Sequence, residues 1–322
     1  MKPQYEGLVG DVGGTNARFA LVDAQGHIRN PRTFQARDYA SLGDVIADYL
    51  EHTAGRKQPP RAVIAVAGPV LEGEIEFTNL DWQICEADLL AQFEFEAVKL
   101  INDFAAQALA CPLLEPDDLR VLGEPHRPSP DAPMVVLGAG TGFGVAGLAR
   151  SERGDVAVAT EGGHAAFAPY DDVEVEIWRR LRALYGRASI ERLLSGPGLF
   201  DLYKALADIE GAAAALPDDK GVIEAANAGD ARAAAAVDRF CAILGSVAGD
   251  LALSFGARGG VFVSGGLGPR IADRLAASAF RRRFEDKGRL APYVAQIPTS
   301  LVLHPYPAIV GAARELAQME RL

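Results

Sequence analysis

The sequence lacks the features that mark several classes of protein. Its 322 residues include three cysteines, Cys85, Cys111 and Cys241, and none of them belongs to a CxxC pair or to another metal-type spacing. This usage is typical of reduced cysteines in a cytosolic protein and not of a disulfide framework. No apolar run is long enough to span a bilayer, and Asp11 interrupts the start too early for a signal peptide. These absences predict a soluble, cytoplasmic protein that has no membrane partner.

Positive charge is also scarce. The formal net charge is −11, from 43 acidic and 32 basic residues, and no long basic run occurs. Nucleic acid and anionic membrane are therefore not expected as partners. An anionic cofactor such as ATP is compatible with this charge, because backbone N–H groups and a metal ion can supply local positive charge.

Two common nucleotide motifs are missing. No GxxxxGK[ST] sequence occurs, which excludes a P-loop protein. Residues 142–147 match GxGxxG, but their second half continues as an apolar strand-like run. A dinucleotide-binding fold needs this motif to open a helix, so we interpret the match as accidental.

Short apolar runs alternate with helical patterns along the chain. Two strand–turn–strand units, Gly7–Asp23 and Met134–Ala149, are each followed by alternating strands and helices. The proline-rich residues 115–133 are predicted to link two lobes. The pattern indicates a duplicated α/β architecture with a cleft between the lobes, in keeping with the chain length. Alanines at helical spacing predict helix within residues 211–236, without a functional signal.

Individual elements follow from periodicity and from flanking turn residues. Predicted strands are Gly7–Val12, Ala17–Asp23, Ala62–Ala67, Glu74–Phe77, Val98–Asn102, Met134–Leu137, Val145–Ala149, Val156–Ala159 and Val261–Val263. Predicted helices are Leu42–His52, Asp103–Ala110, Val173–Leu184, Gly198–Ala207, Ala231–Phe255 and Ala308–Met319.

Three glycine-rich turns follow predicted strands. Phosphate oxygens need several converging N–H donors, and glycine permits the close backbone approach and the positive φ angles that this requires. Each turn alone could equally be a tight hairpin, but their combination favours phosphate binding. A carboxylate beside phosphates is repulsive without a divalent ion, so Asp11 is predicted to hold Mg²⁺, directly or through water. The turns are Gly10-Asp11-Val12-Gly13-Gly14-Thr15, Gly138-Ala139-Gly140-Thr141-Gly142 and Ser264-Gly265-Gly266.

A polar pair, Asn102 and Asp103, stands where a predicted buried strand runs into a helix. Strand ends at a lobe junction are where α/β proteins place chemistry. Asp103 could be a helix N-cap, which is the commoner use of Asp there, or the base that a kinase needs beside the attacking hydroxyl. The adjacent Asn102 favours the functional interpretation.

Further polar residues could bind a polyol. Glu161 and His164 lie in a loop and could accept and donate hydrogen bonds to sugar hydroxyls, whereas a zinc site would need Cys or His neighbours that are missing. Asn79 and Glu191 are weaker candidates.

These motifs together resemble those of bacterial glucokinases. The resemblance covers nearly the whole chain, and the motifs occur in the family's order. They are LVGDVGGTNARFALVD, FTNLDW, LINDFAAQALA, VLGAGTGFGVAGL, TEGGHAAFAP, ERLLSGPGLFDLY, GGVFVSGGLGPR and FEDKGR. No cysteine-rich zinc motif follows His164, so the chain resembles the zinc-free glucokinases and not the repressor/kinase group with structural zinc. One departure is Leu80, where the family is expected to have histidine.

The resemblance implies a two-lobed, actin-like (ribonuclease H-like) α/β ATPase fold with an interlobe cleft. It implies a small lobe of residues 1–112, completed by a C-terminal helix at 305–322, and a large lobe of residues 113–304. The implied reaction transfers the γ-phosphoryl group of ATP, with Mg²⁺, to the 6-hydroxyl of glucose. The implied assembly is a homodimer.

The resemblance also implies roles for residues at matching positions, with Asp103 as general base. Implied sugar contacts are Asn79, Asn102, Asp103, Gly140, Glu161, His164 and Glu191. Implied ATP contacts are Gly10, Asp11, Val12, Gly13, Gly14, Thr15, Asn16, Gly138, Thr141, Gly142, Gly265 and Gly266, with Asp11 as the Mg²⁺ anchor.

Two alternatives stay open at the level of sequence. A kinase for another hexose, such as mannose, fructose or glucosamine, would carry the same motifs. A non-catalytic sugar sensor should have lost the base or a phosphate loop, and both are intact. A sugar-responsive regulator would need a DNA-binding segment ahead of the first glycine turn, which begins at Gly10.

The implied sugar contacts predict closure of the lobes on glucose. Asn79, Asn102 and Asp103 precede the proline-rich stretch, whereas Glu161, His164 and Glu191 follow it. One small sugar must therefore draw both groups together. Glucose alone should therefore lower the radius of gyration in small-angle scattering and raise the thermal midpoint, because it binds only the folded, closed form. Saturating glucose that changed neither quantity would contradict this placement of the sugar.

Overall fold

The computed structural model describes residues 5–53, 58–76, 82–152 and 154–319, which form two compact units. The first unit consists of Met1–Leu114, Ser151–Ala159 and His304–Leu322. The second consists of Glu115–Arg150 and Thr160–Leu303. Within the described ranges, no helix is both long and apolar enough to cross a membrane.

A five-stranded sheet forms the centre of the first unit, with the strand order β3-β2-β1-β4-β7. The first three strands run antiparallel as a meander, and β1, β4 and β7 run parallel. The strands are β1 (Tyr5–Val12), β2 (Asn16–Asp23), β3 (Ile28–Gln35), β4 (Arg61–Val66) and β7 (Ala97–Asn102). A separate small hairpin pairs β5 (Glu74–Glu76) with β6 (Gln83–Cys85).

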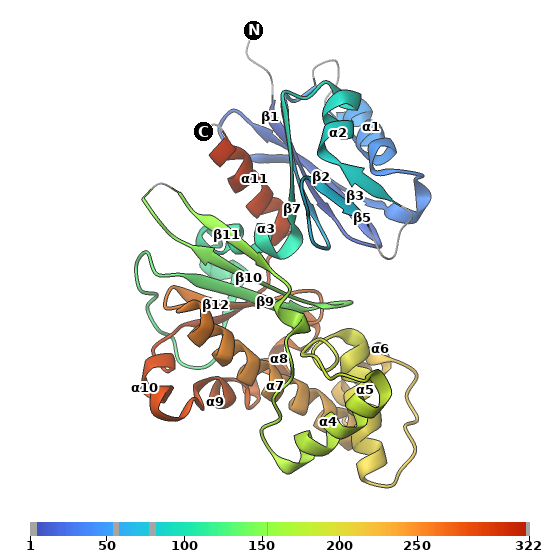
Figure 1. Ribbon diagram of the computed structural model, residues 1–322, viewed down its shortest axis with the longest axis vertical. Coiled ribbons are helices and arrows are strands. Elements are labelled where there is room, and N and C mark those ends of the chain that lie inside the picture. The colour runs from blue at the N-terminus through green and yellow to red at the C-terminus, as the bar shows by residue number, and fades with distance from the viewer. Residues whose placement is uncertain (1–4, 54–57, 77–81, 153, 320–322) are drawn as a thin grey trace. The chain divides into compact units, whose positions relative to one another are not determined.

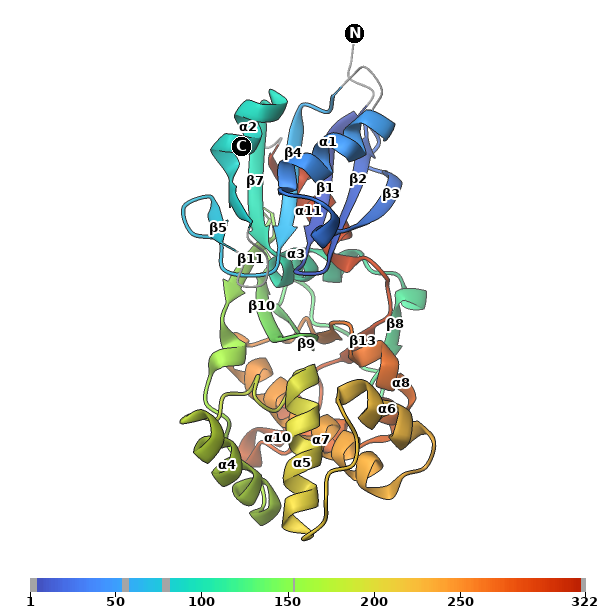
Figure 2. The same ribbon diagram turned by 90° about the vertical axis from the view of Figure 1, so that its right-hand side faces the viewer.

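Helices cover both faces of this sheet, as Figures 1 and 2 show. Helices α1 (Leu42–Thr53) and α2 (Glu86–Phe93) pack on one face, and α3 (Asp103–Ala110) and α11 (Pro307–Met319) on the other. Strands that are buried on both faces have nearly continuous apolar sequences, which explains the runs in β1 and β4. The helices α3 and α11 touch so closely that a Cβ on Gly311 would lie 1.6 Å from the carbonyl oxygen of Ala106.

A second sheet has six strands in the order β11-β10-β9-β12-β13-β8. Residues Gly142 to Gly147 run into β10 and open no helix, so the GxGxxG match is indeed no dinucleotide motif. The stretch 115–133 is more than the predicted link, because Leu119–Val121 forms β8 antiparallel to β13. The strands are β8 (Leu119–Val121), β9 (Met134–Ala139), β10 (Phe143–Ala149), β11 (Val156–Thr160), β12 (Gly260–Ser264) and β13 (Thr299–Val302).

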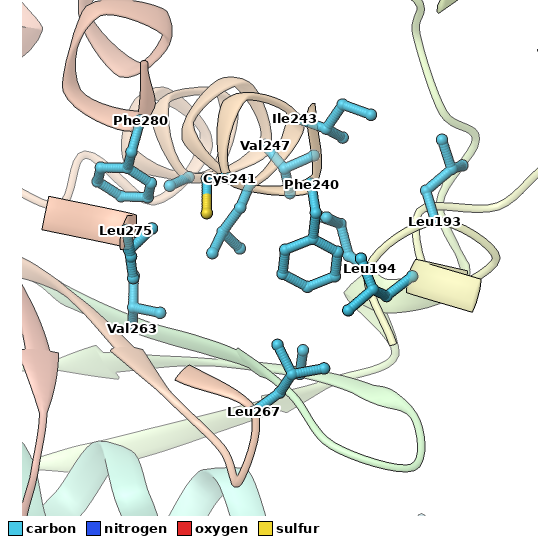
Figure 3. Packing of buried hydrophobic residues seen from close by; sticks show 14 of the residues in the cluster. Leu193, Leu194, Phe240, Cys241, Ile243, Val247, Val263, Leu267, Leu275 and Phe280 are labelled. Atoms are coloured by element: carbon cyan, nitrogen blue, oxygen red, sulfur yellow. The ribbon is translucent and has the colours of Figure 1, made fainter. Parts of the chain in front are cut away.

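The helices of the second unit surround the long helix α7. Residues of α7, among them Phe240 and Cys241, pack against Val263 of β12 and against Leu267 and Phe280 (Figure 3). Burial raises the pKa of the Cys241 thiol to about 12, so this cysteine is a packing residue. The helices are α4 (Asp172–Tyr185), α5 (Gly196–Ile209), α6 (Asp219–Asn227), α7 (Ala231–Phe255), α8 (Ala272–Ala277), α9 (Phe280–Glu285) and α10 (Ala291–Val294).

The predicted strands and long helices occur at nearly the predicted bounds. Part of the alanine-rich stretch that was predicted to be helical is an exception. Within 211–236, the alanines of residues 212–217 are not helical. Helix α5 ends before Gly211, which has a positive φ of 68°, and α6 begins only after its N-cap, Asp218. Helix propensity did not prevail there, because Gly211 and Pro217 interrupt the stretch.

A buried ion cluster joins three helices of the second unit. Glu174 of α4 is fully buried and accepts two hydrogen bonds from Arg283 of α9, at 2.9 and 3.2 Å. Arg239 of α7 lies 3.1 Å from the same carboxylate and also pairs with Asp171. Arg283 donates a further hydrogen bond of 2.8 Å to the hydroxyl of Ser246 on α7. Each buried charge therefore has fixed partners of opposite charge.

Breaking this cluster should destabilise the protein. In Glu174→Gln, the buried Arg283 loses its carboxylate partner, whereas the partly exposed Arg239 keeps Asp171. Removing one partner of a buried pair typically costs about 3–5 kcal/mol. Urea denaturation should show the loss. The matched control is Glu176→Gln on the same helix, which removes only exposed pairs with Arg179 and Arg180. Equal midpoints for the two variants would contradict a stabilising role for the cluster.

Candidate active site

The first unit brings two of the predicted motifs to one edge of its sheet. In the parallel register, Val12 pairs with Val66, and Val66 pairs with Asn102. The carboxyl ends of β1, β4 and β7 are thus level, and at that edge the first glycine turn continues from the end of β1 and Asn102 ends β7. Neighbouring strands lie about 4.8 Å apart, so the two motifs are separated by about 10 Å of sheet. This edge is where α/β proteins place ligands.

The first glycine turn is closed by a hydrogen bond of 2.9 Å from the N–H of Gly13 to the carbonyl of Asn16. Gly14 and Thr15 are exposed, so the turn is open to a ligand. The expected positive φ angles are absent from Gly10, Gly13 and Gly14. Gly10 has a packing reason instead, since a Cβ there would lie 2.8 Å from the ring of Phe19.

Asp11 has a partner that the sequence analysis missed. Arg18 of β2 donates a hydrogen bond of 2.9 Å to Oδ2 of Asp11, whose side chain is 18% exposed. Burial raises the pKa of the Asp11 carboxyl, and the Arg18 guanidinium opposes that shift. Hairpin pairing could have revealed this contact, because Asp11 and Arg18 are register partners across the turn.

The residues around Asp11 fit a magnesium ion held partly by phosphates. Within the ranges described, no group of three or more His, Cys, Asp or Glu residues could enclose a metal ion. Mg²⁺ usually takes only one or two carboxylates and completes its shell with water and substrate phosphates. One carboxylate beside an open glycine turn matches that requirement.

Asn102, and not Asp103, is the N-cap of α3. Its Oδ1 accepts hydrogen bonds from the N–H groups of Phe104 and Ala105, at 3.0 and 3.1 Å. Its Nδ2 donates to the carbonyl of Gly68 and to Oδ1 of Asp103, both at 3.1 Å. The capping alternative for Asp103 is therefore wrong, and Asn102 holds the Asp103 carboxylate in place. Asn79 lies outside the described residues.

The second unit brings the second and third glycine turns together. Gly138 of β9 pairs with Ser264 of β12, and a Cβ on Gly138 would lie 2.1 Å from the Ser264 carbonyl oxygen. Among the glycines of the three turns, only Gly265 has a positive φ, of 85°. Its α-carbon faces the second turn, where a Cβ would lie 2.5 Å from the carbonyl of Ala139. Close approach, more than positive φ, explains these glycines. Gly140 and Gly266 have open space around them.

The predicted sugar residues of the second unit lie around the second turn. Glu161 and His164 are 57% and 58% exposed, and their side chains lie 3.9 Å apart. Gly163, which lies between them in the sequence, packs closely against β10, since a Cβ at Gly163 would lie 2.1 Å from the Phe143 carbonyl oxygen. Glu191 accepts a hydrogen bond of 2.9 Å from the N–H of Phe143 and donates its own N–H to Gly163, also at 2.9 Å. Glu191 therefore joins the loop of Glu161 and His164 to the second glycine turn.

Ser195 is a second residue that the sequence analysis missed. Its buried hydroxyl donates to the Glu191 carbonyl at 2.8 Å and, as the N-cap of α5, accepts from the Gly198 N–H at 3.0 Å. The next residue, Gly196, donates its N–H to the Gly140 carbonyl at 2.9 Å. The Ser-Gly-Pro sequence before a helix is a cap signal that could have drawn attention to it.

Known proteins resemble this chain over nearly its whole length. The glucokinase family model matches residues 8–319. The chain is 51% identical over 310 residues to a glucokinase of Caulobacter sp. (strain K31), covering 95% of this chain and 94% of the relative. A crystal structure of a glucokinase from an Antarctic psychrotroph has a TM-score of 0.88 at 38% identity, covering 98% of this chain and 99% of that one.

A more distant structure shares the fold alone. A ROK-family glucokinase from Streptomyces griseus, in complex with glucose and AMPPNP, has a TM-score of 0.67 at 22% identity, with 97% and 99% of the two chains covered. These similarities confirm the actin-like α/β ATPase fold.

Removing the Ser195 hydroxyl should loosen the second glycine turn. In Ser195→Ala, α5 loses its cap and the Glu191 carbonyl loses a donor, which typically costs about 1 kcal/mol. The amides of Phe143, Gly196 and Gly198 should exchange hydrogen about fivefold faster. Ser254→Ala is the control, because Ser254 makes a similar bond to the Asp250 carbonyl at an exposed position of α7. Faster exchange at Gly198 alone would show that Ser195 caps the helix without supporting the turn.

Proposed function

The chain belongs to the glucokinase family and is an ATP-dependent glucose kinase, and we propose that Asp103 is its general base. The reaction transfers the γ-phosphoryl group of ATP to the 6-hydroxyl of glucose and gives glucose 6-phosphate and ADP. The observation that supports this role is the fixed position of Asp103. Its carboxylate accepts hydrogen bonds from Asn102 and from the Phe104 N–H, at the sheet edge that carries the first glycine turn.

A base in this position would act as the sugar oxygen attacks phosphorus. Asp103 would accept the proton of the 6-hydroxyl while the new O–P bond forms and the bond to ADP breaks. Little covalent chemistry is left to the protein in phosphoryl transfer, so positioning of the two substrates supplies most of the catalysis. The cap formed by Asn102 serves this positioning, because it fixes both the start of α3 and the Asp103 side chain.

The glycine turns would bind the phosphates of ATP. The donors we propose are the backbone N–H groups of Gly14–Thr15 and Thr141–Gly142, with the side chains of the exposed Thr15 and Thr141 beside them. The N–H groups of Gly13 and Gly140 are already bonded within their turns and hold these turns in shape. Gly265 and Gly266 would form the third wall, which is continuous with the second turn through the pairing of Gly138 with Ser264. The remaining proposed contacts of the nucleotide are Gly10, Asp11, Val12, Asn16 and Gly138.

We propose Mg²⁺ as the companion of ATP, with Asp11 as its protein anchor. When bound, Mg²⁺ neutralises negative charge on the phosphate oxygens. Arg18 occupies one carboxylate oxygen of Asp11 and thereby orients the side chain. The Asp11 carboxylate would bind the ion directly or through a water molecule, as expected of a cation that keeps part of its hydration shell.

The proposed sugar contacts are those that the family resemblance implies. The exposed side chains of Glu161 and His164 can accept and donate hydrogen bonds, and Glu191 has a fixed carboxylate. Asn102 makes four hydrogen bonds within the protein, so its main contribution would be to hold Asp103. Gly140 and Asn79 complete the proposed set. We further propose, from the family resemblance, that the protein is a cytoplasmic homodimer.

Replacing the proposed base should affect turnover more than sugar binding. Asp103→Asn keeps the size and hydrogen bonds of the side chain but removes the proton acceptor, so kcat should fall about 10²–10⁴-fold with a much smaller change in the KM for glucose. A coupled assay for ADP measures both constants. Asp88→Asn, an exposed position on α2, is the matched control. A kcat near the wild-type value in Asp103→Asn would remove Asp103 from this role.

A further inference from the structure

A pocket of ≈ 240 Å³ lies in the first unit, outside the phosphate turns and the residues assigned to glucose. It forms where the N-terminal part of α11 stops covering the sheet, beside the mostly exposed strand β3. None of the residues that line it is acidic, although the chain as a whole carries a formal charge of −11. The pocket is lined chiefly by Arg18, Ile28, Thr33, His304, Tyr306 and Val310.

The strand register shows which polar side chains share the face of the sheet that α11 covers. Arg18 of β2 pairs with Thr33 of β3, so these two side chains lie on one face. Arg32 also borders the pocket, but it pairs with Phe19. The Phe19 ring packs against Tyr49 on the opposite face, at 5.7 Å between centroids. Arg18 is therefore the arginine whose guanidinium faces the pocket.

Donors of hydrogen bonds dominate the polar part of the pocket. The Arg18 guanidinium carries five N–H groups, and Thr33 supplies a hydroxyl. Nδ1 of His304 accepts a hydrogen bond of 3.1 Å from the Tyr306 N–H, which leaves the ring proton on Nε2 as a donor. The guanidinium also lies over the Tyr306 ring, 5.7 Å from its centroid. These groups suit a planar oxyanion, because a guanidinium matches the two oxygens of a carboxylate.

Apolar side chains form the rest of the wall. Ile28, Pro31, Ile309 and Val310 offer no hydrogen-bonding side-chain atoms to an occupant. A volume of ≈ 240 Å³ holds a molecule of about one six-membered ring with its carboxylate, since cavities of about 150 Å³ already accept benzene in other proteins. A single arginine favours a monoanion over a phosphate dianion, especially with the Asp11 carboxylate nearby.

We propose that this pocket is a regulatory site for a small organic carboxylate with an apolar ring or chain, and that its occupant weakens ATP binding through Arg18. Arg18 is the link, because the same guanidinium holds Asp11 by the 2.9 Å ion pair. A carboxylate in the pocket competes with Asp11 for that guanidinium and leaves Asp11 less firmly oriented. This coupling rests on the role proposed for Asp11, whereas the binding itself does not.

Binding can be tested with 4-fluorobenzoate as probe and neutral 4-fluorobenzamide as control, by ¹⁹F NMR titration of the full chain without ATP or glucose. The wild type should bind the benzoate saturably and the benzamide at least tenfold more weakly, because a hydrogen bond to a charged group contributes about 1.5–3 kcal/mol. Val310→Phe, which fills the pocket, should abolish binding, and Thr33→Val should weaken it severalfold. Thr53→Val, outside the pocket in the same unit, should bind like the wild type.

The coupling is tested separately by kinetics. Saturating 4-fluorobenzoate should raise the KM for ATP of the wild type up to about fivefold, the effect of losing an ion pair of about 1 kcal/mol. The same concentration of 4-fluorobenzoate should leave the KM for ATP of Val310→Phe unchanged. No saturable binding, or equal binding by wild type and Val310→Phe, would overturn the site. Should Val310→Phe fail to fold, undiminished binding by Thr33→Val would overturn it. Binding without a change in the KM for ATP would overturn the coupling and leave the kinase assignment intact.

Discussion

The parallel register of β1, β4 and β7 is the constraint on which the proposed chemistry of the first unit depends. Because Val12, Val66 and Asn102 are level across three strands, the phosphate turn and the proposed base occur at one sheet edge. A slip of one residue in β7 would turn Asn102 to the other face of the sheet and break its bonds to Gly68 and to the first turn of α3. The apolar residues on both faces of these strands oppose such a slip, since helices bury both faces.

In the second unit, close backbone contacts position the proposed phosphate turns. In the first unit, the polar side chain of Asn102 positions the proposed base, Asp103. Gly138 and Gly265 let two turns approach so closely that no Cβ would fit between them. The segment of Glu191–Gly196 then joins both neighbours, with bonds to Phe143 and Gly140 on one side and to Gly163 on the other. The proposed sugar loop and the proposed phosphate turn are therefore joined by a few short hydrogen bonds.

Much of the fold could be predicted because its elements carry strong local signals. The hairpin of β1 and β2 has two nearly continuous apolar strands around a Gly-Gly turn, and α7 is a long apolar helix with an Asp cap. The strand β8 was missed because three residues among prolines carry no periodicity, and only pairing with β13 makes them a strand. Sequence could not decide whether Asp103 or Asn102 caps α3, since both residue types cap helices equally well. The glycines of the turns were found, but the positive φ angles expected of them occur only at Gly265. The close packing partners of the others are distant in sequence and could not be predicted from it.

The ion pair of Asp11 and Arg18 connects the proposed Mg²⁺ anchor with the proposed regulatory pocket. A carboxylate beside phosphates must be held in place, and a guanidinium on the neighbouring strand does this without occupying both of its oxygens. The Arg18 side chain is 32% exposed and borders a pocket that none of the other proposed site residues lines. A group with five donors can serve two acceptors, but a second anion weakens its bond to the first. The proposed anion in that pocket would therefore act on Asp11 through a single side chain, with no rearrangement of the backbone required.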